Sequence, residues 1–507
     1  MTRARGFMVC AGAALTLSAG AQAGLDVGVT EDAGKTGNGA AFFATLNDVG
    51  LKVNRVSVNW SPAAPTTIPG EAEIAAWLPQ ARISGARILF AVAPQNAKDL
   101  TATPGATAQF VAFVQRLART FPTVKDYVIG NEPNQPRFWA PQYSAAGKPL
   151  AAAQYLQVLA GSYDVLKAHD PTINVIGVGL SPRGNDNPTA RNNASRSPVR
   201  FLSDLGTAYR ASGRTTPVMD ELAFHPYPQP QQAPPSVGYG WPTAGLANLD
   251  RIKQAVWDAF HGTAQPTFSE RGATFSQPLR LDLDEVGWQV EIPPTFAALY
   301  HGVETPGLRL VNEQTQADYY ADLIASVECD PAVRMLSFFH LLDENDLGRW
   351  QSGLERADGS RRASYERVKQ TIAHTHGDCQ AVPVKWRHLT SVLLPVAVWG
   401  KWRKPLPLRR RRWTFAAGTG EDATFRAGIF KAGPKKAVLG KRLAAGRPKP
   451  VLRASGSIKP KRRVVYFPSR KLKRGTYVFA IRMSATMNPQ RTSVLVSRSF
   501  RVGAARR

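Results

Sequence analysis

The chain has 507 residues, which suffices for one large domain and a smaller one. Its composition, with 43% hydrophobic, 20% charged and 9% aromatic residues, excludes disordered, collagen-like and disulfide-scaffold proteins. The net charge of +27 belongs to the C-terminal part: residues 1–380 carry 32 Lys+Arg and 35 Asp+Glu, whereas residues 381–507 carry 32 Lys+Arg and only Glu421 and Asp422. The two parts therefore need separate functional interpretations.

The chain begins with a basic segment, which is followed by an apolar stretch and a group of small residues. Residues 2–5 contain two arginines, residues 6–19 carry no charge, and residues 21–23 read Ala-Gln-Ala. This pattern predicts a signal peptide over residues 1–23, a mature chain beginning at Gly24 and an extracellular location, in solution or at the cell wall. The alternative is a single membrane anchor, which the short apolar stretch disfavours.

Two cysteines remain after the predicted cleavage removes Cys10. Cys329 and Cys379 would lie in a compartment where disulfides persist, so either a bridge between them or two separate thiols fits the sequence. His374 and His376 precede Cys379, but no second group of ligands accompanies them. A disulfide or a plain helix end is therefore preferred to a metal site.

Short β-rich runs alternate with longer amphipathic stretches across residues 24–380. The predicted strands are 25–29, 54–58, 87–92, 126–129, 174–178, 221–225, 280–284 and 334–340. The predicted helices are 108–120, 151–169, 199–211, 246–260, 315–329 and 364–374. Such alternation fits a (β/α)₈ TIM barrel or a doubly wound open sheet. Polar residues follow several of the strands, and a barrel brings these ends together at one mouth, so the barrel is preferred.

Two glutamates leave buried strands at their C-terminal ends. Glu132 follows the fourth strand in Gly130-Asn-Glu-Pro-Asn134, and Glu285 ends the seventh in Asp284-Glu-Val-Gly-Trp288. A pair of carboxylates in one concave site is the arrangement that glycosidic cleavage requires. The alternative is a pair of solvated loop glutamates.

These motifs carry a resemblance to a known group of enzymes. Asn131-Glu-Pro133 on the fourth strand, His225-Pro-Tyr227 on the sixth, Glu285-Val-Gly-Trp288 on the seventh and Arg55 on the second resemble clan A of the retaining glycoside hydrolases. The cellulase-like and β-xylosidase-like branches, including bacterial exopolysaccharide endoglycosidases, are the most similar. The resemblance covers about residues 24–375.

The resemblance implies a role for each matching residue. Glu132 would be the general acid/base and Glu285 the nucleophile, with Asn131 bonding the sugar 2-hydroxyl. Tyr227 would donate a hydrogen bond to Glu285, and Arg55 would stabilise the charge of the same carboxylate. The alternative for Arg55 is a buried ion pair with another acid at a strand end.

Two further positions affect this assignment. His225 is expected to line the same wall, unless it is a structural histidine bonded to the backbone. Asp284 stands where many relatives have a small residue. Since neighbours on a strand face opposite sides, Asp284 is expected to face the helix layer or to pair elsewhere, and an inward Asp284 would put the nucleophile in question.

Tryptophans and two long loops are expected to shape the substrate site. The tryptophans in or near loops after strands are Trp60, Trp139, Trp241, Trp288 and Trp350. For each of them, packing in the core is the alternative to contact with a sugar. Trp288 and Trp350 are predicted to contact substrate, and loops 181–198 and 227–243 to select it. The sequence contains no phosphate loop, dinucleotide fingerprint or metal-ligand spacing, so it predicts neither a cofactor nor a metal.

From residue 381 the pattern changes to short β-like runs with Gly and Pro between them. The runs are 392–399, 414–415, 424–430, 463–467, 476–482 and 493–502, and they predict a small antiparallel sandwich over residues 381–507. Residues 472–481 resemble the last hairpin of an immunoglobulin-like module.

Basic clusters at residues 409–412 and 459–463 predict a positive surface on this second domain. An anionic cell-wall polymer, an acidic polysaccharide or a membrane surface is the preferred partner. Nucleic acid is disfavoured by secretion and by the lack of a recognition motif, and a charge bias serving only solubility is the remaining alternative.

Together these features predict a secreted retaining glycoside hydrolase that cleaves β-O-glycosidic bonds of an oligo- or polysaccharide. One alternative is a carbohydrate-binding protein on a barrel scaffold that has lost turnover. Another makes the basic domain the working part and the barrel its carrier.

Overall fold

The structure is a computed structural model. It describes residues 24–36, 39–268, 278–375, 413–434, 436–445, 450–460, 464–467 and 472–503. The predicted signal peptide, Cys379 and the basic residues 409–412 and 461–463 lie outside these ranges, as does the predicted strand 392–399. None of the helices within the described ranges is long and apolar enough to cross a membrane.

Eight parallel strands close into a barrel in which each strand pairs with its neighbours in chain order. Their bounds are β1 Asp26–Thr30, β2 Val53–Trp60, β3 Arg87–Pro94, β4 Asp126–Ile129, β5 Asn174–Leu180, β6 Glu221–Phe224, β7 Arg280–Val286 and β8 Val333–Phe338. Pairing of β1 with β8 completes the ring. All eight predicted strands are present, and the closed ring confirms the barrel over the open sheet.

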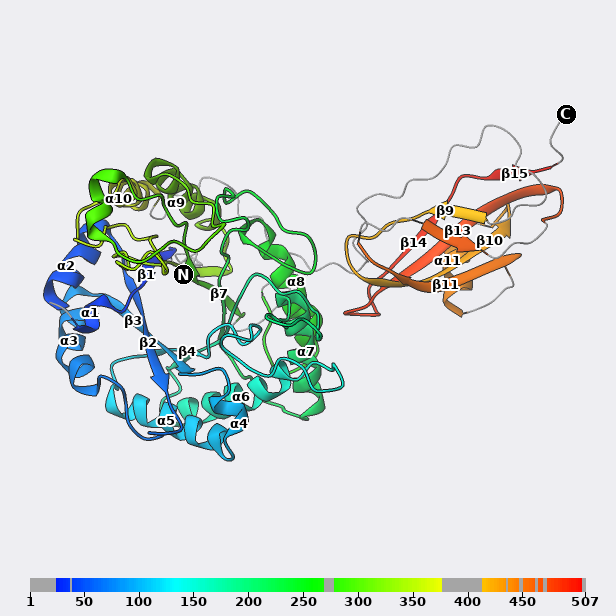
Figure 1. Cartoon of the computed structure of the whole chain (residues 1–507). Helices are drawn as coiled ribbons and strands as arrows, with labels where there is room; N and C mark the ends of the chain where they lie inside the picture. Colours follow the sequence, from blue (N-terminus) through cyan, green and yellow to red (C-terminus); the bar gives the residue numbers. More distant parts are fainter. Residues whose placement is uncertain are drawn as a thin grey trace, which may run out of the picture.

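Helices form a ring outside the strands (Figure 1). Their bounds are α1 Ala33–Thr36, α2 Gly39–Val49, α3 Glu71–Ser84, α4 Asp99–Ala102, α5 Ala106–Thr120, α6 Ala151–His169, α7 Pro198–Ala211, α8 Leu249–Phe260, α9 Glu313–Val327 and α10 Ala363–Thr375, with 3₁₀ turns at Leu246–Asn248 and Pro294–Leu299. The sequence had not predicted α2 and α3. In α3 the periodicity is weak, because Pro79 interrupts it and only Ile74, Trp77 and Ala81 are buried.

The inside of the barrel is a packed core with a charged layer. Apolar residues from the strands form one buried cluster: Val53, Leu89, Ala91, Val128, Ile176, Ala223 and Met335. Nearer the N-terminal ends of the strands, Arg334 pairs with Asp126 at 3.3 Å, with Asp282 at 3.1 Å and with Glu221. Burial and the nearby Asp282 raise the pKa of Glu221 well above its usual value. The site at the opposite ends of the strands therefore stands on a closed, water-excluding base.

The C-terminal region is a β-sandwich, which confirms the predicted fold class. Its elements are β9 Trp413–Ala416, β10 Ala423–Lys431, α11 Lys436–Ala445, β11 Leu452–Ile458, β12 Val464–Phe467, β13 Gly475–Ala485, β14 Thr492–Val496 and β15 Phe500–Val502. One sheet has the order β11-β10-β13-β14, with β15 also pairing β13, and β9 pairs with β12 in a second sheet. Between the sheets, Phe415 stacks on Phe479 with 4.4 Å between ring centroids.

Two elements of the sandwich were not predicted. The sequence of β11, Leu-Arg-Ala-Ser-Gly-Ser-Ile, has few β-branched residues, so its strand conformation depends on antiparallel pairing with β10. Helix α11 packs on the outer side of the larger sheet against Phe430 and Val478. In addition, the predicted run 493–502 is divided into β14 and β15.

The sandwich lies beside α7 and α8 of the barrel (Figure 1). Buried Arg491 pairs with Asp258 of α8 at 2.9 Å and with Glu421 at 2.6 Å. Arg200 of α7 pairs with Asp422 at 2.8 Å. Since Glu421 and Asp422 are the only acids after residue 380, both acids of this region serve the contact with the barrel.

Candidate active site

Glu132 leaves β4 through a backbone turn that requires glycine. Gly130 has φ 87°, and a Cβ at this position would lie 2.9 Å from the ring of Tyr155. Glu132 itself has φ 40°, a value that non-glycine residues rarely adopt. Its N–H donates to the carbonyl of Gly179 at 2.8 Å, which holds the turn against β5.

Tyr155 of α6 fixes the ends of β4 and β5 relative to each other. Its buried hydroxyl donates to the carbonyl of Ile129 at 2.6 Å and accepts from the N–H of Val178 at 2.8 Å. Val178 has φ 84° and Gly179 has φ 57°, and the pairing with β6 shifts register between Val178 and Leu180. The two strand ends thus carry irregular backbone that buried hydrogen bonds support.

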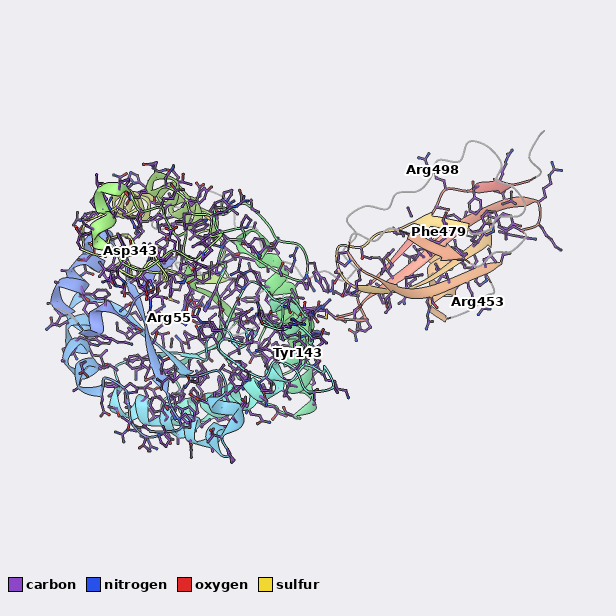
Figure 2. All side chains as sticks on the ribbon, in the orientation of Figure 1. Arg55, Tyr143, Asp343, Arg453, Phe479 and Arg498 are labelled. Atoms are coloured by element: carbon purple, nitrogen blue, oxygen red, sulfur yellow. The ribbon has the colours of Figure 1, made fainter. Side chains whose placement is uncertain are left out.

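Asp284 and Glu285 on β7 both reach Arg55 of β2. The Nε atom of Arg55 lies 2.9 Å from Oδ2 of Asp284, and its Nη1 lies 2.8 Å from Oε1 of Glu285. Figure 2 shows Arg55 within the ring of strands. The expectation that Asp284 faces the helix layer is therefore wrong. The register of β7 against β8 shifts between Leu283 and Val286, and this irregularity lets neighbouring carboxylates turn to one cation.

The inward position of Asp284 leaves Glu285 as the reachable carboxylate. The side chain of Asp284 is 0% exposed and that of Glu285 is 11% exposed. Burial opposes ionisation of Asp284, but the positive charges of His225 and Arg55 hold its pKa below the usual value. Asp284 is thus a buried, charged partner of the site, and Glu285 opens to the mouth of the barrel.

His225 lies beneath all three carboxylates. Its Nδ1 lies 3.0 Å from Glu132 and 3.5 Å from Glu285, and its Nε2 lies 3.2 Å from Asp284. Burial disfavours the imidazolium, but Glu285 and Asp284 outweigh it and raise the pKa of His225 to about 10. The ring is 0% exposed and contacts all three carboxylates. The alternative of a histidine bonded to the backbone is not observed.

Tyr227 and Asn131 complete the set of hydrogen bonds. The Tyr227 hydroxyl donates to Oε2 of Glu285 at 3.1 Å, and Arg55 donates to Oδ1 of Asn131 at 2.9 Å. Burial, together with the negative charge of Glu285, raises the pKa of Tyr227 well above its usual value. Tyr227 therefore stays a neutral donor, and both oxygens of Glu285 are held by side chains.

The distances to one imidazole nitrogen limit the separation of the two glutamates. Oε1 of Glu132 and Oε2 of Glu285 lie 3.0 and 3.5 Å from Nδ1 of His225, so they cannot be farther apart than these two distances together. That limit falls at the lower end of the range of about 6.5–9.5 Å found in inverting glycosidases, and it admits the value of about 5–5.5 Å found in retaining ones.

The site contains one more carboxyl group than it has cations. Three carboxylates face two cations, Arg55 and the His225 imidazolium. Asp284 and Glu285 each contact both cations, whereas Glu132 contacts only His225. Glu132 is therefore the carboxyl group of the cluster with the fewest cationic contacts.

Aromatic rings form one wall of the mouth. Trp350 lies 5.0 Å from Tyr227 and 5.3 Å from Phe339, and all three are on loops that follow strands. Trp350 is half-buried, as a ring that binds a sugar would be. Phe339, which follows β8 directly, had not been predicted.

Trp288 does not lie at the mouth, contrary to expectation. Its ring is 1% exposed, packs edge-on against Tyr319 and Tyr320 of α9, and donates to the carbonyl of Ala233 at 2.8 Å. This indole therefore belongs to the core of the barrel domain beside α9. Trp60 and Trp139 are core residues as well.

The closed ring of eight parallel strands is a (β/α)₈ TIM barrel, and the candidate site residues lie at its C-terminal strand ends. No protein-family model matches the chain. No curated protein matches it either.

Several solved structures are similar to the chain. A family 39 glycoside hydrolase from Bacteroides cellulosilyticus WH2 has a TM-score of 0.47 and 14% identity, with 89% of this chain and 81% of that one covered. A monomeric β-xylosidase from Caulobacter crescentus CB15 has a TM-score of 0.41 and 13% identity, covering 91% and 96%. A glucosidase from Croceicoccus marinus has a TM-score of 0.43 and 12% identity, covering 85% and 89%.

Proposed function

We propose that the protein is a secreted retaining glycoside hydrolase that cleaves β-O-glycosidic bonds of an oligo- or polysaccharide by double displacement. The observation that carries the proposal is the shared contact of Glu132 and Glu285 with Nδ1 of His225, at 3.0 and 3.5 Å. This contact brings an acid and a nucleophile to one point at the C-terminal mouth of the barrel.

In the first step Glu132 donates its proton to the glycosidic oxygen while Glu285 attacks the anomeric carbon. The bond between that carbon and the leaving oxygen breaks, and an ester forms between the sugar and Glu285. Arg55 and Tyr227 hold the two oxygens of Glu285, which keeps this carboxylate aimed at the anomeric carbon.

In the second step the roles reverse. Glu132, now a carboxylate, takes a proton from water as that water attacks the anomeric carbon and releases Glu285. The His225 imidazolium lies within 3.5 Å of both glutamates, so it stabilises the negative charge on whichever of them carries it. The side-chain charge of the cluster is the same before and after turnover.

Substrate would bind against the aromatic wall and Asn131. The Oδ1 of Asn131 accepts from Arg55, so its amide group remains as a donor to a sugar hydroxyl. Trp350, supported by Tyr227 and Phe339, offers a ring for stacking beside the cleaved bond.

The proposal is tested by hydrolysis of aryl β-glycosides and of β-glucan, xylan and mannan polymers. We expect turnover by the wild type, with net retention of anomeric configuration in the first product seen by ¹H NMR. Glu285→Ala should lose activity by at least about 10³-fold on every substrate. Glu132→Ala should lose about 10²–10⁴-fold on substrates with poor leaving groups and much less on dinitrophenyl glycosides, which need no protonation.

Glu291→Ala is the matched control, because Glu291 is an exposed glutamate shortly after the same strand as Glu285. It should keep wild-type rates. Binding of glycans without turnover in the wild type would instead identify a carbohydrate-binding protein on a barrel scaffold, and inverted products would exclude the double displacement.

A further inference from the structure

One half of the outer face of the larger sandwich sheet is a flat array of arginine and hydroxyl side chains. Two rows cross the four strands β11, β10, β13 and β14 in register. The first row is Ser457, Thr424, Ser484 and Thr492, and the second is Ser455, Arg426, Arg482 and Val494. Arg453 begins the next row, opposite Gly428. We call the residues of these rows, together with Arg453, the arginine face.

The arginine face is open to solvent. The alternate residues of the same strands point inward and form the sandwich core with Phe415 and Phe467. Helix α11 covers only the other half of the outer surface, at Phe430, Val478 and Ala480. The members of the arginine face are exposed or half-buried.

Two arginines of this face are neighbours across adjacent strands. Arg426 and Arg482 are directly opposite each other on adjacent strands, and like charges in this position destabilise a sheet. The face itself contains no acid. Glu421 and Asp422, the only acids after residue 380, pair with Arg491 and Arg200 at the barrel.

We propose that the arginine face binds an acidic polysaccharide whose sugar units carry carboxylates. Guanidinium groups pair with carboxylates through two parallel hydrogen bonds, and the Ser and Thr hydroxyls in the flanking row match the hydroxyls of a sugar ring. A flat face about four strands wide suits an extended chain of sugars, since neighbouring strands lie about 4.8 Å apart.

Other polyanions fit this face less well. Nucleic acid single strands bind through bases stacked on exposed aromatic rings, and none of the residues of the face is aromatic. Insertion into a lipid surface uses Trp, Phe or Leu beside the basic residues, and the only apolar member of the two rows is Val494.

The face lies at the end of the sheet nearest the barrel. Beyond Ser484, the chain reaches Met487, which packs against the barrel core, and Asn488, which donates to Asp258 of α8 at 3.2 Å. A polymer on the arginine face would therefore be held beside the catalytic domain. The proposal does not depend on turnover by the barrel.

The test is binding of polygalacturonate to the full chain carrying Glu285→Gln, measured by calorimetry at about 50 mM salt, where screening is moderate. Arg426→Gln/Arg453→Gln/Arg482→Gln should weaken binding at least about tenfold. Arg426→Lys/Arg482→Lys keeps the charge but loses the paired hydrogen bonds, so it should weaken binding by a smaller factor. Neutral hydroxyethylcellulose should show no difference between the variants.

The matched control removes three positive charges elsewhere on the sandwich, by Lys473→Gln/Arg498→Gln/Arg501→Gln. Figure 2 shows Arg498 well separated from Arg453. This control should bind within about threefold of the parent, since its residues lie outside the arginine face. Three results would each overturn the proposal. They are equal losses of affinity in the two triple variants, no binding of polygalacturonate by the parent, and tighter binding of the parent to phosphatidylglycerol vesicles or polyuridylate than to polygalacturonate.

Discussion

His225 is the residue on which the charge balance of the site depends. Its ring is surrounded by Glu132 above β4, by Asp284 and Glu285 on β7, and by the edge of Tyr227. These carboxylates raise the pKa of His225 to about 10, although burial opposes the charge. The imidazolium is thus a fixed cation at neutral pH, unlike a histidine that transfers protons during turnover.

This shift predicts a pH dependence of stability. The pKa of His225 is raised from its ordinary value of 6.5, so the stabilisation from its charge is fully present below pH 6.5 and is lost as the pH rises towards 10. Between these limits, the free energy of unfolding of the wild type should fall by a few kcal/mol more than that of His225→Gln. Urea unfolding at a series of pH values measures the free energy of unfolding of both proteins.

The comparison needs a histidine variant outside the site. His261→Gln serves, because His261 is half-buried and lies at the C-terminal end of α8. It should follow the wild-type curve. Parallel curves for the wild type and His225→Gln would show that the imidazolium contributes no charge-linked stability.

At the scale of elements, the C-terminal ends of β4 and β5 determine the position of Glu132. Glu132, Val178 and Gly179 all have positive φ, and the Tyr155 hydroxyl bridges the two strands beneath them. Unfavourable backbone of this kind persists where the surroundings hold it in place, and it is common at catalytic sites. The strain here directs Glu132 towards the His225 imidazole.

Gly179 is the position at which this idea is tested. A Cβ there would lie 3.3 Å from Nε2 of His225, which pairs with Asp284. We expect Gly179→Ala to displace the imidazole and to lower kcat at least about tenfold, besides costing about 1–2 kcal/mol of stability for the positive φ. Steady-state kinetics and thermal unfolding separate the two effects.

Gly213→Ala is the control for backbone strain alone. Gly213 has φ 67°, and a Cβ there meets nothing within 4 Å. This variant should lose similar stability and keep the wild-type kcat. If both variants kept full activity, the close approach of Gly179 to His225 would have no catalytic consequence.

At the scale of the whole molecule, buried ion pairs join the sandwich to the barrel. Arg491 is 3% exposed and lies between Asp258 of α8 and Glu421 of the sandwich. Burial raises the pKa of Asp258, although Arg491 opposes this effect. Arg200 links Asp422 to Asp186 in loop 181–198 and lies 5.4 Å over the ring of Trp241 in loop 227–243. Arg200 of α7 therefore connects the sandwich to both loops expected to select substrate.

Removal of the ion pairs of Arg491 should make the two domains unfold at different temperatures. Arg491→Gln leaves two buried acids without their cation, which costs about 3–5 kcal/mol. We expect differential scanning calorimetry to show an additional transition at lower temperature for the sandwich. Arg214→Gln, which removes a cation paired with the exposed Asp164, should leave a wild-type profile. An unchanged profile for Arg491→Gln would mean that the ion pairs do not couple the domains.

The sequence by itself determined the order of the barrel strands and indicated the residues of the candidate site. All eight barrel strands follow from short β-rich runs, because burial on both faces requires continuous apolar residues. Glu132 and Glu285 were proposed because each ends such a run, and Arg55, His225 and Tyr227 because their motifs resemble a known family; the structure brings these side chains together. The helices α2 and α3 and the strand β11 could not, because their own periodicity is weak and their packing depends on neighbours.

Only the tertiary structure decided where the side chains point. Alternation counted from an inward Glu285 placed Asp284 on the outside, but both carboxylates reach Arg55, because the register of β7 shifts between Leu283 and Val286. Trp288 was expected at the mouth because it follows this strand, but its ring is buried against α9. The arginine face likewise appears only when β11, β10 and β13 pair in register. Local sequence sets the conformation of a strand, but contacts between residues far apart in the chain set its register and bulges.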